Sequence, residues 1–187
     1  KKNYKIFEMK IYKTKIKDLL IIKQKNNIDK RGSLRETYNK KFFNNKKFIF
    51  EYCTTSKKNV ARGFHFQTKF QQAKYVNVLK GKILDVVIDL RKKSKTFGKH
   101  FKVVLSDNNG KSLFIPKGFA HGFLGLKKEN IIYYLNTQYQ KKKSAIGILW
   151  NDKDLKIKWP IKNPILSKQD KKNITFTNFK KLYLRKT

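Results

Sequence analysis

Two short segments each place one histidine among aromatic residues and beside a glycine. Residues 62–67 (RGFHFQ) contain His65, and residues 116–122 (PKGFAHG) contain His121. An imidazole titrates near neutral pH, so either histidine could take and return a proton as a general base or acid. On spacing alone, two buried histidines held by hydrogen bonds are the more common arrangement, because a single histidine is a weak catalytic signal.

The elements around these histidines are predicted to be strands, because apolar and polar residues alternate and helical periodicity is scarce. Val76 and Val78 belong to one strand, and a second strand at residues 83–89 follows a tight turn that Gly81 permits. Other strands are expected at residues 48–52, 101–105, 112–115, 131–135 and 146–150, with a turn at 106–110. Helix is expected only in short pieces, such as residues 167–171. The pattern predicts an all-β fold, an antiparallel sandwich or barrel.

The 187 residues are enough for one domain with a proper core. Met9 is the only methionine and resembles a natural start, so we expect residues 1–8 to be an upstream extension and residues 9–187 to form a single domain. The sequence shows neither a secretory signal nor an apolar run of the roughly 18 residues that a membrane span needs. Cys53 stands alone, which excludes an internal disulfide and favours a cytoplasmic protein.

The formal net charge of +35 invites the interpretation that the protein binds nucleic acid. However, 42 of the 47 basic residues are lysines, and they are dispersed, the longest clean run being residues 141–143. Proteins that read nucleic acid usually concentrate their basic residues on one face. We therefore predict no specific nucleic-acid partner. The 12 acidic residues are scarce enough to be considered singly, above all Glu36, Asp85, Asp89 and Asp170.

Eight segments, in order along the chain, resemble the dTDP-4-dehydrorhamnose 3,5-epimerase family of nucleotide-sugar epimerases. They are residues 29–36 (DKRGSLRE), 59–67 (NVARGFHFQ), 85–91 (DVVIDLR), 94–98 (SKTFG), 115–123 (IPKGFAHGF), 150–152 (WND), 157–160 (IKWP) and 167–170 (SKQD). Each segment alone is a weak signal, but the ordered set extends over nearly the whole chain. The resemblance implies a metal-free cupin jelly roll, no cofactor, a homodimer, and a role in dTDP-rhamnose and surface-polysaccharide biosynthesis.

The reaction that the resemblance implies is proton abstraction and return at carbon. In a nucleotide-linked 4-keto-6-deoxyhexose, the ketone acidifies the hydrogens at C3 and C5, because it can hold the charge as an enolate. Inversion needs a base on one face, an acid on the other, and a cation or donor near the keto oxygen. The expected conversion is of the type that takes dTDP-4-dehydro-6-deoxyglucose to dTDP-4-dehydrorhamnose.

By position in the resemblance, four residues carry this chemistry. His65 is the base, Tyr134 is the acid, Asp170 fixes and stabilises the histidine, and Lys74 stabilises the enolate. Without the resemblance, Tyr134 would be an ordinary strand aromatic, Asp170 a helix cap and Lys74 a solvated surface lysine. Strand alternation directs Tyr133 to the opposite face, so only one tyrosine of this pair can be the acid.

The resemblance also implies residues that bind the substrate, with arginine forks suited to pyrophosphate. This set is Arg31, Glu36, Arg62, Gln67, His121 and Tyr139. A metal site is not expected, because Phe64 and Phe66 flank His65 where metal-binding cupins have a second histidine, and the three histidines are scattered. His100 is interpreted as a surface residue.

Departures from the family pattern cluster where the nucleotide is held. They fall at Phe50, Tyr52, Gln140, Ala145 and Gln169. Either Tyr139 or Tyr52 takes over stacking on the base, or the chain prefers another nucleotide. The alternatives to a 3,5-epimerase are a single-carbon epimerase or ketoisomerase acting on a CDP- or GDP-sugar, and a non-catalytic basic jelly-roll module.

Overall fold

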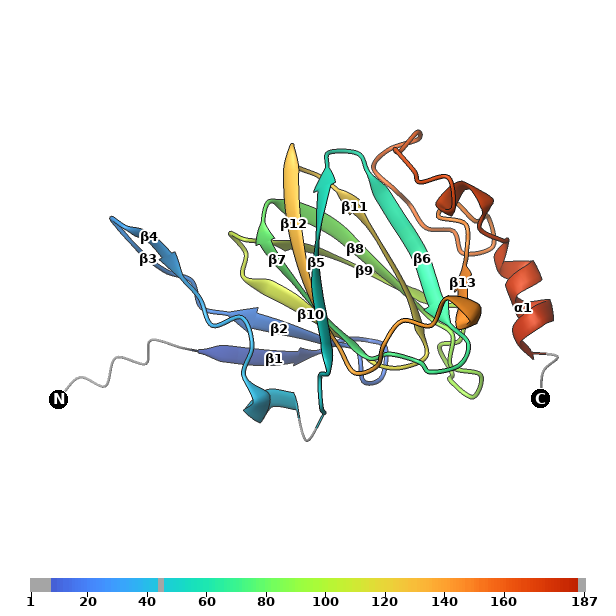
Figure 1. The fold of residues 1–187 in the computed structure, drawn as a ribbon, viewed down its shortest axis with the longest axis horizontal. Coiled ribbons are helices and arrows are strands. Elements are labelled where there is room, and N and C mark those ends of the chain that lie inside the picture. Colours follow the sequence, from blue (N-terminus) through green and yellow to red (C-terminus); the bar gives the residue numbers. More distant parts are fainter. Residues whose placement is uncertain (1–7, 44–45, 185–187) are drawn as a thin grey trace.

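Two antiparallel β-sheets face each other in the computed structural model, which describes residues 8–43 and 46–184 (Figure 1). The six-stranded sheet has the order β1 (Met9–Lys13), β2 (Leu20–Gln24), β10 (Lys111–Ile115), β7 (Lys74–Lys80), β12 (Glu129–Asn136), β5 (Phe50–Lys57). The five-stranded sheet has the order β13 (Ala145–Gly147), β6 (Ala61–Gln67), β11 (Phe119–Gly125), β8 (Lys82–Asp89), β9 (His100–Ser106). The predicted all-β, cupin-like jelly-roll class is confirmed.

The remaining elements are short. A hairpin of β3 (Asn27–Asp29) and β4 (Gly32–Leu34) projects from the body, at the end of the molecule opposite to β13 and the helix α1 (Phe176–Leu184) (Figure 1). Three single 3-10 turns are η1 (Lys40–Phe43), η2 (Lys142–Ser144) and η3 (Asp170–Lys172). Among the described residues, no helix is long and apolar enough to cross a membrane.

Both sheets are apolar on both faces, which explains why their strands contain so many consecutive hydrophobic residues. On β12, Ile132 and Tyr134 point between the sheets, whereas Tyr133 and Leu135 pack on the outer face under Phe43. On β8, Val87 points inward, while its neighbours belong to an outer cluster covered by α1. Burying one such aliphatic or aromatic side chain contributes roughly 1.5–3 kcal/mol, so three layers of core hold the two sheets in place.

The strands predicted on each side of Gly81 exist, but the turn between them crosses from one sheet to the other. β7 pairs with β10 and β12, whereas β8 pairs with β9 and β11. Gly81 has φ +87°, and a Cβ there would lie 2.2 Å from the Glu129 carbonyl oxygen, so only glycine fits this corner. The turn at residues 106–110 likewise leads from β9 into the opposite sheet, so the expected returning strand does not lie beside β9.

Three sequence predictions were wrong in extent. The strand expected at residues 48–52 begins at Phe50 and continues to Lys57, and the strand expected at 146–150 is only Ala145–Gly147. The helix expected at 167–171 is the 3-10 turn η3.

The helix α1 was not predicted, although its apolar residues Phe176, Phe179 and Tyr183 have helical spacing and pack on the five-stranded sheet. Its first backbone N–H donates to Asp152 Oδ2 at 2.7 Å. Asp152 thus caps the helix from a distant loop.

The predicted extension, residues 1–8, lies outside the described residues except for Glu8. The Glu8 carbonyl accepts a hydrogen bond from the Lys25 N–H at 3.0 Å, and its carboxylate lies 3.1 Å from Lys10 Nζ. Strand β1 begins at Met9. The division into an extension and one domain stays a prediction.

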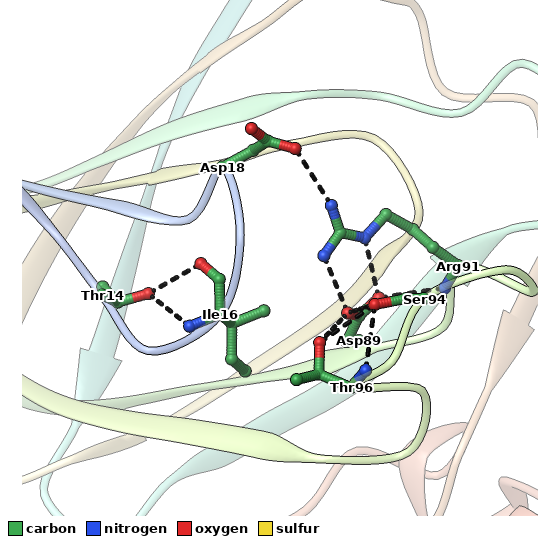
Figure 2. A network of polar contacts seen from close by, with 7 residues as sticks. All are labelled: Thr14, Ile16, Asp18, Asp89, Arg91, Ser94 and Thr96. Carbon is green, nitrogen blue, oxygen red and sulfur yellow. Dashed lines mark hydrogen bonds and ion pairs between the residues drawn. The ribbon is translucent and has the colours of Figure 1, made fainter.

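A dense polar network secures the loop after β8, beside the turn that leads into β11 (Figure 2). The buried Asp89 receives Arg91 Nε at 2.9 Å and Nη2 at 2.8 Å, and the hydroxyls of Ser94 and Thr96 each donate to it at 2.6 Å. Burial would raise the pKa of Asp89, but these donors together lower it. The Arg91 guanidinium also reaches Asp18 at 3.2 Å and lies 4.7 Å from the ring centre of Phe119. Asp89 is therefore structural, and its network supports one wall of the cavity described below.

Candidate active site

A cavity of about 540 Å³ is lined by both sheets, by the segment after β12 and by the segment around η3. The side chains in it that can do chemistry come from β5, β6, β7, β11 and β12. They are Tyr52, Arg62, His65, Lys74, His121 and Tyr134. Six residues predicted from sequence to act on the substrate thus line one cavity, namely Arg62, His65, Gln67, Lys74, His121 and Tyr134.

His65 forms a hydrogen-bonded pair with Asp170 across 105 positions of sequence. Its Nε2 lies 2.7 Å from Asp170 Oδ1, and 54% of the His65 side chain is exposed whereas Asp170 is buried. Burial raises the pKa of Asp170, but its hydrogen bonds, the first from His65, more than offset this and lower it. Asp170 therefore stays ionised beside the imidazole, and it can stabilise the positive charge that a histidine base acquires.

The two histidine motifs lie side by side because glycines let β6 and β11 approach closely. His65 and His121 are register partners on these strands. A Cβ on Gly63 would lie 2.6 Å from the His121 carbonyl oxygen, and a Cβ on Gly122 would lie 2.7 Å from that of Arg62. The glycine near each histidine, two residues before His65 and directly after His121, is thus a packing requirement that brings the two imidazoles to the same wall.

His121 is more deeply placed and is bonded to the buried Asp85. The distance from His121 Nε2 to Asp85 Oδ2 is 2.8 Å, and Asp85 has no exposed surface. The ring of Tyr134 meets His121 edge-on at 6.1 Å and stacks on Tyr52 at 4.7 Å. Burial raises the pKa of Tyr134 well above 10, and Tyr52 and Asp85 raise it further. Tyr134 is therefore a phenol that keeps its proton at neutral pH and can donate it.

Among the described cationic residues that line the cavity, Lys74 has the pKa that departs furthest from its ordinary value. Burial lowers its pKa to about 8, although the charge of Asp85 opposes this shift. An ammonium group in such a setting is poorly solvated and therefore interacts strongly with any negative charge that develops nearby. This is the property that stabilisation of an enolate requires.

Arg62 and Gln67 have defined structural partners at the edge of the cavity. Arg62 donates from Nε to Ser56 Oγ at 3.0 Å and from Nη2 to the Thr55 carbonyl at 3.2 Å. Gln67 Nε2 donates to the Phe70 carbonyl at 2.7 Å, and its Oε1 accepts the Lys141 N–H at 2.6 Å. Gln67 thus fixes the segment that follows β12, while Arg62 lies in position for an anionic group.

Three predicted substrate-binding residues are not among the lining residues in the part of the chain that the structure describes. Arg31 pairs with Asp29 at 2.6 Å on the β3–β4 hairpin and has 84% of its side chain exposed. Glu36 accepts a hydrogen bond from Asn39 at 2.9 Å. Tyr139 is 52% exposed and packs 5.8 Å from Phe50, outside the cavity. Their substrate-binding roles stay predictions.

Asn173, which no sequence pattern singled out, also lines the cavity, and its amide contacts three groups around the histidine–aspartate pair. Its Nδ2 lies 3.3 Å from the Gly63 carbonyl, 3.4 Å from that of Ile148 and 3.5 Å from Asp170 Oδ1. Only its position three residues after Asp170 could have indicated this role. His100 lies on β9 outside the cavity lining and is partly buried, and burial together with Lys102 lowers its pKa.

The described residues include no group of three or more His, Cys, Asp or Glu side chains that could hold a metal ion. The absence of a metal and of a cofactor stays a prediction.

Comparison with known proteins agrees with this geometry. The sequence pattern of the dTDP-4-dehydrorhamnose 3,5-epimerase family matches residues 13–178. The Shigella flexneri enzyme of that name is 40% identical over 168 residues, covering 87% of this chain and 93% of the relative. The Escherichia coli enzyme is 38% identical, covering 94% and 99%.

Solved structures of epimerases from this family also resemble the chain. The Bacillus anthracis epimerase, determined with TDP and pyrophosphate bound, is 36% identical with a TM-score of 0.86, covering 90% of this chain and 100% of that one. The Legionella pneumophila epimerase, in complex with dTDP-4-keto-L-rhamnose, is 35% identical with a TM-score of 0.87, covering 91% and 94%. The chain belongs to the dTDP-4-dehydrorhamnose 3,5-epimerase family.

Proposed function

We propose that this protein inverts C3 and C5 of dTDP-4-dehydro-6-deoxyglucose, giving dTDP-4-dehydrorhamnose, with His65 as the base and Tyr134 as the acid. The observation that carries the proposal is the convergence of an imidazole, a phenol and a partly buried ammonium group on one cavity of suitable size. A cavity of 300–1,000 Å³ is typical for a small-molecule site. The family to which the chain belongs supplies the reaction type.

The chemistry divides among four side chains. Asp170 accepts a hydrogen bond from Nε2–H of neutral His65, so the other ring nitrogen, Nδ1, takes the proton from the sugar carbon. The C–H electron pair moves toward the ketone, and the ammonium group of Lys74 stabilises the resulting enolate oxygen. Tyr134 then delivers its proton to the opposite face of that carbon. Solvent restores the proton on Tyr134 and removes the one on His65 before the second carbon reacts.

Arg62 is suited to the diphosphate, because a guanidinium group offers several donors to phosphate oxygens. Gln140, Ala145 and Gln169, three of the positions that depart from the family pattern, line the same cavity. Tyr52, a fourth of these positions, also lines the cavity, so base recognition in this chain can draw on the amides of Gln140 and Gln169 or on the ring of Tyr52.

The protein is proposed to act as a homodimer in which the β3–β4 hairpin completes the partner's site. Arg31 and Glu36 lie outside the cavity of their own chain, and the hairpin projects away from the body (Figure 1). Ile28 and Leu34 on this hairpin are 77% and 54% exposed, which is unusual for apolar residues on so small an element and fits a covered surface in the assembly.

Mixing two inactive variants tests this arrangement. A 1:1 mixture of His65→Asn and Arg31→Ala dimers, after subunit exchange, should recover roughly a quarter of the wild-type sites, because each mixed dimer holds one site with both residues intact. If Arg31 served its own chain, no site in the mixture would be complete and activity would not recover.

Because Cys53 is alone and needs no oxidising compartment, the proposed location is the cytoplasm.

Deuterium exchange tests the reaction itself. Wild-type protein incubated with dTDP-4-keto-6-deoxyglucose in heavy water should incorporate deuterium at both C3 and C5, as measured by NMR. His65→Asn should slow incorporation by about 10²–10⁴-fold, the usual contribution of a general base. Tyr133→Phe is the matched control, because this neighbour of Tyr134 points to the outer face of its sheet. Incorporation at one carbon only would identify a single-carbon epimerase, and none with wild type would refute the proposal.

A further inference from the structure

The ring of Tyr134 is held between two other rings of the cavity wall. Tyr52 lies directly opposite it on β5, as its register partner, and the two rings stack with centroids 4.7 Å apart and planes 18° apart. On another side, His121 meets the Tyr134 ring at 65° with centroids 6.1 Å apart. Tyr52 and Tyr134 both line the cavity. The plane of the Tyr134 ring, and with it the direction of its hydroxyl, is therefore set mainly by side-chain packing.

Tyr52 is itself supported by a row of aromatic residues along the same face of the sheet. Phe50, two residues earlier on β5, packs on Tyr52 at 5.5 Å, and Tyr139 packs on Phe50 at 5.8 Å. Such aromatic pairs contribute about 0.5–1.5 kcal/mol each beyond the area that they bury. Tyr52 thus acts as a fixed surface, and it transmits the rigidity of β5 to the ring of Tyr134.

The hydroxyl of Tyr52 carries no charge in the working pH range. Burial raises the pKa of Tyr52 to about 12, although the charge of Arg62 opposes this shift, so the group stays neutral from pH 7 to 9. What Tyr52 offers to Tyr134 is the face of its ring. An effect of replacing Tyr52 would therefore come from a changed position of the Tyr134 ring and not from a lost charge at Tyr52.

We propose that Tyr52 is a positioning residue that aims the proton-donating hydroxyl of Tyr134 at the face of the sugar opposite His65. The proposal rests on the function proposed above, in which Tyr134 is the acid. Without the Tyr52 ring, His65 still removes the proton, because its own partners are Asp170 and β6. Misplacing a reacting group by about 1 Å can cost on the order of 10²-fold in rate.

The consequence for the chemistry is a change in the fate of the enolate. With the donor misaligned, the enolate is reprotonated by the imidazolium of His65 on the face from which the proton left. In heavy water the imidazolium exchanges its proton with solvent, so this return places deuterium at the carbon without inversion. The ratio of exchange to inversion therefore reports on the alignment of Tyr134 and is insensitive to a general loss of folded enzyme.

The test compares Tyr52→Phe with Tyr52→Leu in heavy water at saturating substrate, and NMR follows deuterium in unchanged and inverted sugar. Tyr52→Phe keeps the ring and should remain within about threefold of wild type in both rates. Tyr52→Leu should lose about 10–100-fold in kcat for inversion, keep KM within about threefold, and raise the ratio of exchange to inversion. Tyr133→Leu is the matched control, because Tyr133 is the neighbour of Tyr134 on β12 but packs on the outer face of the sheet.

Several results would overturn the proposal. A rise in KM with unchanged kcat in Tyr52→Leu would make Tyr52 a substrate-binding residue. Loss of inversion in Tyr52→Phe would give the hydroxyl a direct part. If Tyr52→Leu fails to fold, Tyr52→Met, which fills the gap with an unbranched chain, takes its place, and an unchanged ratio there would refute alignment. If the wild-type protein shows no deuterium exchange at all, the proposed function is refuted instead. Failure of the proposed function can therefore be told apart from failure of the role proposed for Tyr52.

Discussion

Lys74 gives the sharpest test of the proposed chemistry, because its charge should disappear within the working pH range. Its pKa of about 8, set first by burial and opposed by Asp85, lies about 2.5 units below the ordinary value of 10.5. At 1.36 kcal/mol per unit, this net shift disfavours the charged form by about 3 kcal/mol. The ammonium form is thus dominant at pH 7, half populated near pH 8 and reduced to roughly one tenth at pH 9. If this charge stabilises the enolate, the reaction must slow over the same interval.

The measurement is kcat/KM between pH 6.5 and 10 for wild type, Lys74→Arg and Lys74→Gln. Wild type should lose activity above pH 8, by about tenfold per unit. Lys74→Arg should show no such fall up to pH 10, because a guanidinium group stays charged. Lys74→Gln should be weakly active with no fall of this kind. Lys141→Gln removes another lysine that lines the cavity and should leave the profile unchanged.

Loss of the proton from Lys74 does not itself favour unfolding over this interval. The folded state holds Lys74 with a pKa below its unfolded value, so between pH 8 and about 10.4 the unfolded chain binds more protons at this residue. Its contribution to the free energy of unfolding therefore rises as pH increases. A fall in activity that persists in Lys74→Arg would refute the assignment of the charge to Lys74.

Three further predictions concern the supports of the site. Asp170→Asn should lower kcat by about 10–100-fold, because a hydrogen bond to a charged group contributes about 1.5–3 kcal/mol and the histidine partner is half exposed; an unchanged kcat would remove the pair from the mechanism. Asp85→Asn should move the alkaline fall in activity to lower pH, because it removes the charge that raises the pKa of Lys74; an unmoved fall would contradict this. Gly147→Ala should destabilise the protein by about 1–3 kcal/mol in urea unfolding, since a Cβ there would lie 1.9 Å from the Asn173 amide oxygen. An unchanged midpoint would mean that this amide moves aside freely.

The strands of this fold were predictable because alternation is a local property. On β12, the inward Tyr134 and the outward Tyr133 follow directly from the period of two residues. Which sheet a strand joins was not predictable in this way. Gly81 and the turn at 106–110 look like hairpin turns in sequence, yet each leads to the opposite sheet, because the apolar faces on both sides of each sheet allow either pairing.

The site was predictable only through the resemblance to a family. Composition would not have selected Lys74 from 42 lysines, and its low pKa arises from burial that no local pattern encodes. The stacking of Tyr52 on Tyr134 depends on the register of β5 with β12. Arg31 could be identified from its motif, but its distance from the cavity of its own chain is a property of the hairpin's placement. Long-range pairing, rather than residue type, limits such predictions.

The histidine and aspartate of the proposed catalytic pair belong to distant parts of the polypeptide. Strand β6 is complete early in the chain, whereas Asp170 reaches it only after the C-terminal segment has folded back, held by Ile165 beside Val60 and Ile174 beside Ile148. A ribosome must therefore synthesise the chain beyond Asp170 before the proposed pair can form. Proteolytic cleavage that releases this segment would likewise abolish the proposed turnover, and it would uncover the outer face of the five-stranded sheet because α1 would leave with it.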